Sequence, residues 1–212
     1  MGGAYVLVPQ SPAVWINVTG ATYDLSAENS TSMYTQTLME LIEQYVAEHN
    51  NIDTDRIIVG GCSNGGYMTM NMIINYPDYF AAAFPICEAY TDEYITDEQI
   101  NAIKDLPIWF VQAADDTLVV PAENVLPTYE RLVNAGAKKL HFTYWTNVHD
   151  TSGRFTDREG NPEVYFGHGS WRYVFNNECT VDCDYQEGKT TDAMGTGETI
   201  FEWLSQQTKS AE

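Results

Sequence analysis

The sequence is short of positive charge. Only 10 of its 212 residues are lysine or arginine, against 30 aspartates and glutamates, and the formal net charge is −20. Because phosphate binding needs positive charge, this balance disfavours a nucleic-acid partner and an anionic membrane surface. The simplest interpretation of the acidity is a solvated, self-repelling surface.

Long apolar runs are also lacking. No stretch of about 18 apolar residues occurs, so we expect no membrane-spanning segment. Met1, Gly2 and Gly3 lead directly into a predicted strand, so no signal peptide is visible. The compartment stays open between a cytoplasmic protein and one secreted from a longer precursor, and Met1 need not be the natural start.

Cysteine is scarce, with four in the chain. Cys62 and Cys87 each end a predicted strand, which is typical of small buried apolar residues. Cys179 and Cys183 are close enough in sequence for a local disulfide, if the loop between them bends suitably. Their spacing could also suggest metal, but no further pair of cysteine or histidine residues completes a ligand set. We therefore expect no metal site.

Length and hydrophobicity predict one domain over residues 1–212. The chain is 44% hydrophobic and 13% aromatic, which is enough for a sizeable core. Predicted strands alternate with predicted helices, an order that favours an α/β fold with a mostly parallel sheet of about five strands flanked by helices. The strands are expected at 4–8, 56–60, 80–86, 106–113 and 140–145. The helices are expected at 31–50, 66–76, 96–105, 121–135 and 198–206, with a long irregular segment at 146–170.

A strand, a sharp turn and a helix meet at residues 57–68. The turn carries G-x-S-x-G at Gly61, Ser63 and Gly65, the pattern of a nucleophile elbow. We expect the two glycines because side chains at both flanking positions would clash in so tight a turn. The turn places Ser63 at a helix N-terminus, where the backbone N–H of Asn64 could stabilise an oxyanion. A lone G-x-S-x-G also occurs by chance, but here the flanking strand and helix are those that catalysis requires.

A catalytic serine needs a base and an acid that orients the base. In a parallel sheet such groups collect at the carboxyl ends of strands. Asp115 and Asp116 follow the strand that ends at residue 113; we favour Asp116, with Asp115 as the alternative, and one of them could simply cap the next helix. After the last strand come His149 and His168, and the residues alone do not decide between them.

His49 lies at a predicted helix end, and His141 lies inside a predicted strand. Both are poor candidates for the base. The chain order serine, aspartate, histidine is that of the α/β-hydrolases.

Three blocks of the sequence resemble one family. Residues 55–66 resemble the D-R-I-x-x-x-G-x-S-x-G-G block of α/β-hydrolases, in particular the esterase and prolyl-oligopeptidase-like group that includes polyhydroxybutyrate-depolymerase-like and feruloyl-esterase-like enzymes. Residues 116–119 resemble its D-x-x-V acid loop, and residues 167–171 resemble its G-H-x-S-W histidine loop. The last match tips the choice of base to His168. The resemblance extends from Gly3 to about Asn177.

Two departures from that family stand out. In some feruloyl esterases a cysteine before the serine bonds a cysteine beside the histidine; Cys62 is in place, but Gly169 follows His168. The family also has three more strands and a His-Gly-rich loop at the N-terminus, and that loop donates the second oxyanion N–H. We therefore expect the chain to be N-terminally truncated relative to the family, unless another segment completes the oxyanion hole. An uncovered sheet edge and face favour association, so we expect a homodimer or higher homo-oligomer.

Taken together, the residues and the resemblance favour a carboxylesterase. The implied roles are Ser63 as nucleophile, His168 as base, Asp116 as orienting acid and the Asn64 N–H as oxyanion donor, acting on a small-molecule ester without a cofactor. Trp171, Tyr90 and Tyr165 could line an aromatic pocket or belong to the core. One alternative is a peptidase of the prolyl-oligopeptidase type, and another is a non-catalytic binding module with an incomplete oxyanion hole.

Overall fold

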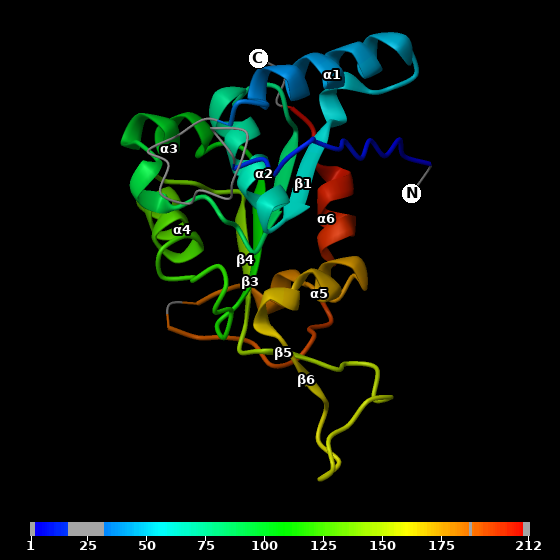
Figure 1. Ribbon diagram of the computed structural model, residues 1–212, viewed down its shortest axis with the longest axis vertical. Coiled ribbons are helices and arrows are strands. Elements are labelled where there is room, and N and C mark those ends of the chain that lie inside the picture. The colour runs from blue at the N-terminus through cyan, green and yellow to red at the C-terminus, as the bar shows by residue number, and fades with distance from the viewer. Residues whose placement is uncertain (1–2, 17–31, 187, 210–212) are drawn as a thin grey trace.

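A parallel four-stranded sheet forms the centre of the protein. The computed structural model describes residues 3–16, 32–186 and 188–209. The strands β1 (Ile58–Cys62), β2 (Ala82–Ile86), β3 (Ile108–Ala113) and β4 (Leu140–Trp145) lie side by side in chain order (Figure 1). Because the strands are parallel, their carboxyl ends meet at one edge of the sheet. This is the edge at which the sequence analysis expects the reactive groups to lie.

Helices cover both faces of the sheet. On one face pack α1 (Thr35–Glu48), α2 (Asn64–Asn75), α3 (Asp97–Ile103) and α4 (Val125–Asn134). On the other face pack the shorter helices α5 (Trp171–Phe175) and α6 (Ile200–Gln206) (Figure 1). The result is a three-layer α/β architecture, which confirms the predicted fold class.

The two cores alternate along β3. Ile108 and Phe110 belong to the core under α1–α4, whereas Trp109 and Val111 belong to the core under α5 and α6. Successive side chains of a strand point to opposite faces, so a strand covered on both sides must be apolar at nearly every position. All six residues of β3 are buried, and this is why the segment is recognisable as an apolar run that only Gln112 interrupts.

The prediction of a strand at residues 4–8 is wrong. Within the described residues this segment joins no sheet, and Val6 and Val8 are 78% and 75% exposed. It lies instead against the end of α1, where the Tyr5 hydroxyl accepts a 2.6 Å hydrogen bond from Asn51 Nδ2 and the Tyr5 ring packs edge-on against Tyr45. A run of β-branched residues becomes a strand only beside a partner strand, and β1 pairs with β2 alone in the part of the chain described. The main sheet therefore has four strands, and the oligomer expected from the sequence stays a prediction.

The segment expected to be irregular carries some regular structure. A small antiparallel pair, β5 (Val148–His149) and β6 (Val164–Tyr165), begins and ends an arm that projects from the body in Figure 1. Two-residue strands leave too little periodicity to be predicted from sequence. The 3₁₀ turns are at Thr54–Arg56, Asp92–Tyr94, Gly167–Gly169 and Val181–Cys183.

The predicted helices differ from the observed ones mainly at their ends. α1 begins at Thr35, and α2 begins at Asn64 directly after the elbow serine. Residue 31, expected at the start of the first helix, lies outside the described residues. Among the helices that the structure describes, none is both long and apolar enough to cross a bilayer.

All four cysteines are free thiols. Cys179 is buried against the α5–α6 face of the sheet, whereas the Cys183 thiol bonds the Ala193 carbonyl at 3.3 Å. The local disulfide considered from their spacing is therefore absent, because the two side chains enter different surroundings. Cys87 is buried as predicted, and Cys62 is only partly so.

Candidate active site

Ser63 sits in a strained turn between β1 and α2. Its backbone has φ 59° and ψ −117°, a region that residues other than glycine rarely adopt. Two hydrogen bonds hold it there: the Ser63 N–H donates to the Ile86 carbonyl at 2.8 Å, and the Tyr67 N–H donates to the Ser63 carbonyl at 2.8 Å. The serine is thus fixed at the carboxyl end of β1 with strain of about 1–3 kcal/mol held by its surroundings.

Close backbone packing explains two glycines near Ser63. A Cβ at Gly61 would lie 2.7 Å from the Gly65 carbonyl oxygen, and a Cβ at Gly66 would lie 2.6 Å from the Ile86 carbonyl oxygen. A Cβ at Gly65, in contrast, would meet nothing within 4 Å. The expectation that both flanking glycines avoid a clash is therefore right for Gly61 and wrong for Gly65. The second crowded position is Gly66, where α2 crosses the end of β2.

Asn64 begins α2, the helix that leads away from the serine. As the first helical residue, it has no carbonyl one turn earlier in the helix to accept its backbone N–H. Its side chain is engaged elsewhere, because Oδ1 accepts a 3.3 Å hydrogen bond from the Ile16 backbone N–H. The backbone N–H of Asn64 is thus the hydrogen-bond donor that the start of α2 presents beside Ser63.

The structure joins Asp116 and His168 directly. His168 Nδ1 lies 2.8 Å from Asp116 Oδ2, although 52 residues separate them in the chain. Asp116 is 3% exposed and follows β3, and His168 lies in the turn Gly167–Gly169 after β6. Asp116 Oδ1 also accepts the backbone N–H groups of Leu118 (2.9 Å) and Val119 (3.0 Å). The acid loop therefore fixes the carboxylate before the imidazole meets it.

The charges of the pair support each other. Burial would raise the pKa of Asp116, but the hydrogen bonds from His168, Val119 and Leu118 outweigh it and hold the pKa below its ordinary value. In turn, the hydrogen bond to the Asp116 carboxylate raises the pKa of His168 to about 10, with a contribution from Cys87. With Nδ1 bonded to the acid, only Nε2 of His168 is left to exchange a proton with another group.

Three residues for which the sequence predicted no role in this pair hold it in place. The buried Gln112 donates from Nε2 to Asp116 Oδ2 at 2.8 Å and to the Val119 carbonyl at 3.0 Å. A Cβ at Gly167 would lie 2.6 Å from the backbone of Asp115, so only glycine lets the histidine loop approach the acid loop this closely. The signal for Gln112 was a polar residue inside an otherwise apolar strand.

Cys87 is the third of these residues. It follows β2 with φ 44°, and its Sγ lies 3.4 Å from the His168 carbonyl oxygen and 3.1 Å from Ser170 Oγ. Its thiol therefore connects the end of β2 with the histidine loop. From sequence it was predicted only to be a small buried residue.

One group of potential metal ligands is present in the described part of the chain. Cys87 Sγ, a carboxylate oxygen of Asp116 and a ring nitrogen of His168 lie within 4.8 Å of one another. A metal would need the thiolate, whereas the neighbouring Cys62 and burial raise the pKa of Cys87. The group therefore fits a hydrogen-bonded network better than a metal centre.

The alternative candidates lie in other surroundings. His149 Nδ1 is 2.9 Å from Asn147 Oδ1 and 3.3 Å from the Tyr173 hydroxyl. Among the described residues, none of its hydrogen bonds is to a carboxylate. Asp115 is largely exposed beside the histidine loop. Partial desolvation of its carboxyl group raises its pKa. The geometry thus pairs Asp116 with His168.

The predicted aromatic residues divide between core and rim. Tyr90 is 1% exposed and stacks on Tyr67 with 4.9 Å between ring centroids, so it belongs to the core. Trp171 is 41% exposed at the start of α5. The half-buried Tyr165 lies under the Arg172 guanidinium, 4.5 Å from its ring centroid. Of the two alternatives, the structure therefore favours core or rim positions over an aromatic pocket built from all three.

A buried acid lies near the elbow. Glu88 is fully buried after β2, and its Oε1 accepts the Tyr90 backbone N–H at 2.6 Å. Burial raises the pKa of Glu88 well above its ordinary value. Burial therefore disfavours the charged form of this carboxyl group.

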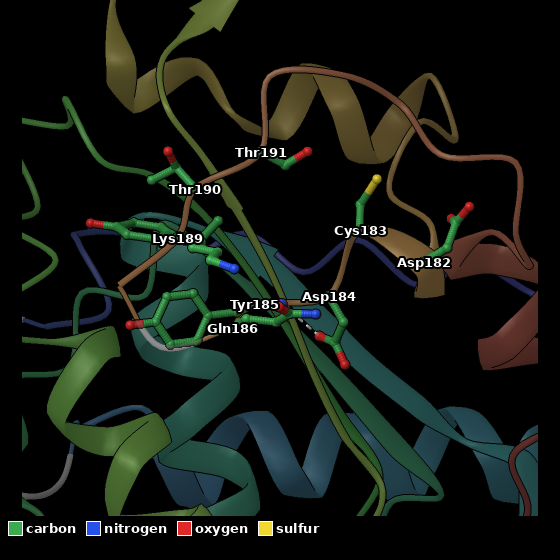
Figure 2. Close-up of a pocket in the computed structure, with 9 residues that line it drawn as sticks. Asp182, Cys183, Asp184, Tyr185, Gln186, Lys189, Thr190 and Thr191 are labelled. Atoms are coloured by element: carbon green, nitrogen blue, oxygen red, sulfur yellow. Dashed lines mark hydrogen bonds between the residues drawn. The ribbon is translucent and has the colours of Figure 1, made fainter.

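A pocket of about 180 Å³ lies at the outer edge of β4 and is not lined by Ser63, Asp116 or His168 (Figure 2). Hydrogen bonds from the backbone N–H groups of Tyr185 and Thr191 to the carbonyls of Phe142 and Tyr144 hold the segments 184–186 and 188–191 at this edge. None of the residues predicted to be catalytic lines the pocket. Its lining consists of Tyr144, Asp182, Cys183, Asp184, Tyr185, Gln186, Lys189, Thr190 and Thr191.

Comparison with known proteins points to one family. The model of a family described as phospholipase/carboxylesterase matches residues 4–157. This range contains Ser63 and Asp116 and ends before His168. No curated protein matches the chain.

Among solved structures, a thermostable esterase is 28% identical with a TM-score of 0.59, covering 84% of this chain and 37% of its own. SOBER1 from Arabidopsis thaliana is 22% identical with a TM-score of 0.41, covering 52% of this chain and 51% of its own. An acylaminoacyl peptidase from Pyrococcus horikoshii is 17% identical with a TM-score of 0.45, covering 57% and 24%. The chain thus spans about a third to a half of the length of the first two structures.

Proposed function

The chain belongs to the phospholipase/carboxylesterase family and has the α/β-hydrolase fold, and from this premise we propose that it is a carboxylesterase with Ser63, His168 and Asp116 as its catalytic triad. The observation that carries the proposal is the 2.8 Å hydrogen bond between His168 Nδ1 and the buried Asp116 carboxylate. It leaves the imidazole oriented at the carboxyl end of the sheet, where the strained Ser63 also lies. The resemblance to a thermostable esterase supports esters as the substrate class.

In the proposed reaction Ser63 Oγ attacks the ester carbonyl while its proton passes to Nε2 of His168. The Asn64 backbone N–H donates to the oxyanion that forms. The imidazolium then gives its proton to the leaving alcohol as the carbon–oxygen bond breaks, and water repeats the sequence to release the acid. Asp116 holds the tautomer and stabilises the positive imidazolium through the reaction.

The experiment that tests this proposal compares two serine variants. Ser63→Ala is expected to lower kcat/KM for p-nitrophenyl butanoate by at least about 10⁴-fold, because the nucleophile is lost. Ser205→Ala is the matched control, since this hydroxyl lies on α6 and bonds the Glu202 carbonyl. A fluorophosphonate should add to Ser63 of the wild-type protein, as found by mass spectrometry.

Three results would contradict the proposal. Undiminished ester hydrolysis by folded Ser63→Ala would exclude this nucleophile. If the folded wild-type protein neither hydrolyses the ester nor reacts with the fluorophosphonate, a non-catalytic module is the better interpretation. Faster cleavage of a proline p-nitroanilide than of the ester would favour the peptidase.

A further inference from the structure

Exposed apolar side chains flank the proposed acid and base. Leu118, in the acid loop, is 58% exposed, and Phe166, two residues before the histidine, is 59% exposed. The Phe166 ring lies 6.2 Å from the His168 ring, centroid to centroid, and the Leu118 backbone N–H bonds Asp116 Oδ1 at 2.9 Å. The Phe166 ring thus lies beside the imidazole, whereas Leu118 is tied to the carboxylate through its backbone, and both side chains are exposed.

The chemistry of acyl transfer indicates which part of an ester these side chains would meet. The imidazole must reach both Ser63 Oγ and the oxygen of the leaving alcohol, because it moves a proton from one to the other. The acyl group stays bonded to the serine. Groups beside the imidazole therefore lie next to the alcohol portion, and groups around the serine lie next to the acyl portion.

Resting on the proposed function, we infer that Leu118 and Phe166 bind the alcohol portion of the ester and select uncharged, apolar alcohols of the aryl or benzyl type. An apolar alcohol would cover both side chains and remove their surface from water. The sequence signal for Phe166 was weak, because a single exposed aromatic residue is common in loops.

Local charge disfavours an anionic alcohol at the same place. The exposed Asp115 packs against Gly167, next to Phe166, and the chain as a whole carries a net charge of −20. The guanidinium of Arg172 already lies over two rings, 4.5 Å from the Tyr165 centroid and 5.2 Å from the Trp171 centroid. A phosphate-bearing alcohol would therefore meet repulsion from Asp115, while a benzyl group would not.

The alcohol contributes to only one half of the reaction. In acylation the bond from Ser63 Oγ to the carbonyl carbon forms, the bond from that carbon to the alcohol oxygen breaks, and the proton from Nε2 of His168 leaves with the alcohol. In deacylation water replaces the alcohol, so the acyl-enzyme is the same whatever ester produced it. A residue that binds only the alcohol should change acylation and leave deacylation unaltered.

The test uses methyl and benzyl butanoate, which share an acyl group and have alcohols of similar acidity. Phe166→Ala is expected to lower the benzyl-to-methyl ratio of kcat/KM by roughly three- to tenfold, and Leu118→Ala by somewhat less. The decay rate of the butanoyl-enzyme, measured after single turnover, should not change. The ratio between ethyl hexanoate and ethyl acetate, which differ only in the acyl group, should also stay constant.

Phe175→Ala is the matched control. Phe175 is 62% exposed, but its ring partner is Trp171, 6.4 Å away, and not the histidine. Its replacement should leave the benzyl-to-methyl ratio unchanged.

Three outcomes would overturn the inference. An unchanged benzyl-to-methyl ratio in Phe166→Ala would mean that the side chain does not touch the alcohol. An equal loss for both esters together with slower deacylation would mean that Phe166 positions His168 instead. Faster hydrolysis of glycerophosphate esters than of benzyl esters by the wild-type protein would exclude the apolar preference. If the fluorophosphonate labels Ser63 in any of these cases, the proposed function stands while this inference fails; without labelling both fail.

Discussion

The elbow around Ser63 and the pair Asp116–His168 are built in opposite ways. The elbow is one contiguous stretch, in which a strand, a strained serine and a helix follow directly. The pair joins side chains 52 residues apart, and it depends on Gln112, in the strand that Asp116 follows, and on Cys87, at the end of β2. Local sterics therefore specify where the nucleophile sits, whereas tertiary contacts decide which base and acid meet.

The largest effect on activity is expected from a substitution that removes the carboxylate of the Asp116–His168 pair. Asp116→Asn removes the negative charge that raises the pKa of His168, so that pKa should fall from about 10 toward the ordinary value of 6.5. Because the base must be neutral to accept the serine proton, activity of the wild-type protein should rise with pH into the alkaline range. In Asp116→Asn this rise should move to lower pH, while kcat falls by about 10³- to 10⁴-fold, since the imidazolium loses its partner.

The pH profile of kcat/KM for a p-nitrophenyl ester measures both changes. Asp115→Asn is the control, because that carboxylate has no hydrogen bond to His168 in the described structure. A profile that shifts in Asp115→Asn and not in Asp116→Asn would reverse the assignment of the acid.

A smaller effect, on stability, is expected when a side chain is added to a crowded glycine of the elbow. In Gly66→Ala the new Cβ would lie 2.6 Å from the Ile86 carbonyl oxygen, so α2 must shift, and we expect a loss of about 1–3 kcal/mol in the free energy of unfolding. In Gly65→Ala the Cβ meets nothing within 4 Å, and the better helix propensity of alanine should add about 0.5–1 kcal/mol. Urea unfolding of the two variants measures the difference. Equal stabilities would show that close packing at Gly66 does not shape the elbow.

The same contrast explains how far the sequence alone could be interpreted. The four sheet strands were predicted because each is a short, largely apolar run, and Ser63 because glycines and a helix surround it. The segment 4–8 has the same composition but was mispredicted, because a strand also needs a partner that composition does not reveal. Local propensity therefore predicted a strand at residues 4–8 that does not form. It also failed to predict the short helix α5.

The two histidines show the remaining limit. His149 and His168 both follow the last sheet strand, and only the resemblance to known histidine loops favoured His168. Their difference is tertiary: one ring bonds a buried carboxylate, and the other bonds Asn147 and Tyr173. Such contacts depend on loops that pack closely, as at Gly167, and no local pattern reports them.

The most direct test of the central claim is the rate of Ser63 modification by a fluorophosphonate in His168→Gln and His149→Gln, with folding checked by thermal unfolding. The serine reacts only when an imidazole accepts its proton. We predict that His168→Gln loses the reaction by about 10³-fold or more, and that His149→Gln reacts at nearly the wild-type rate. Loss of the reaction in His149→Gln with retention in His168→Gln would contradict the account.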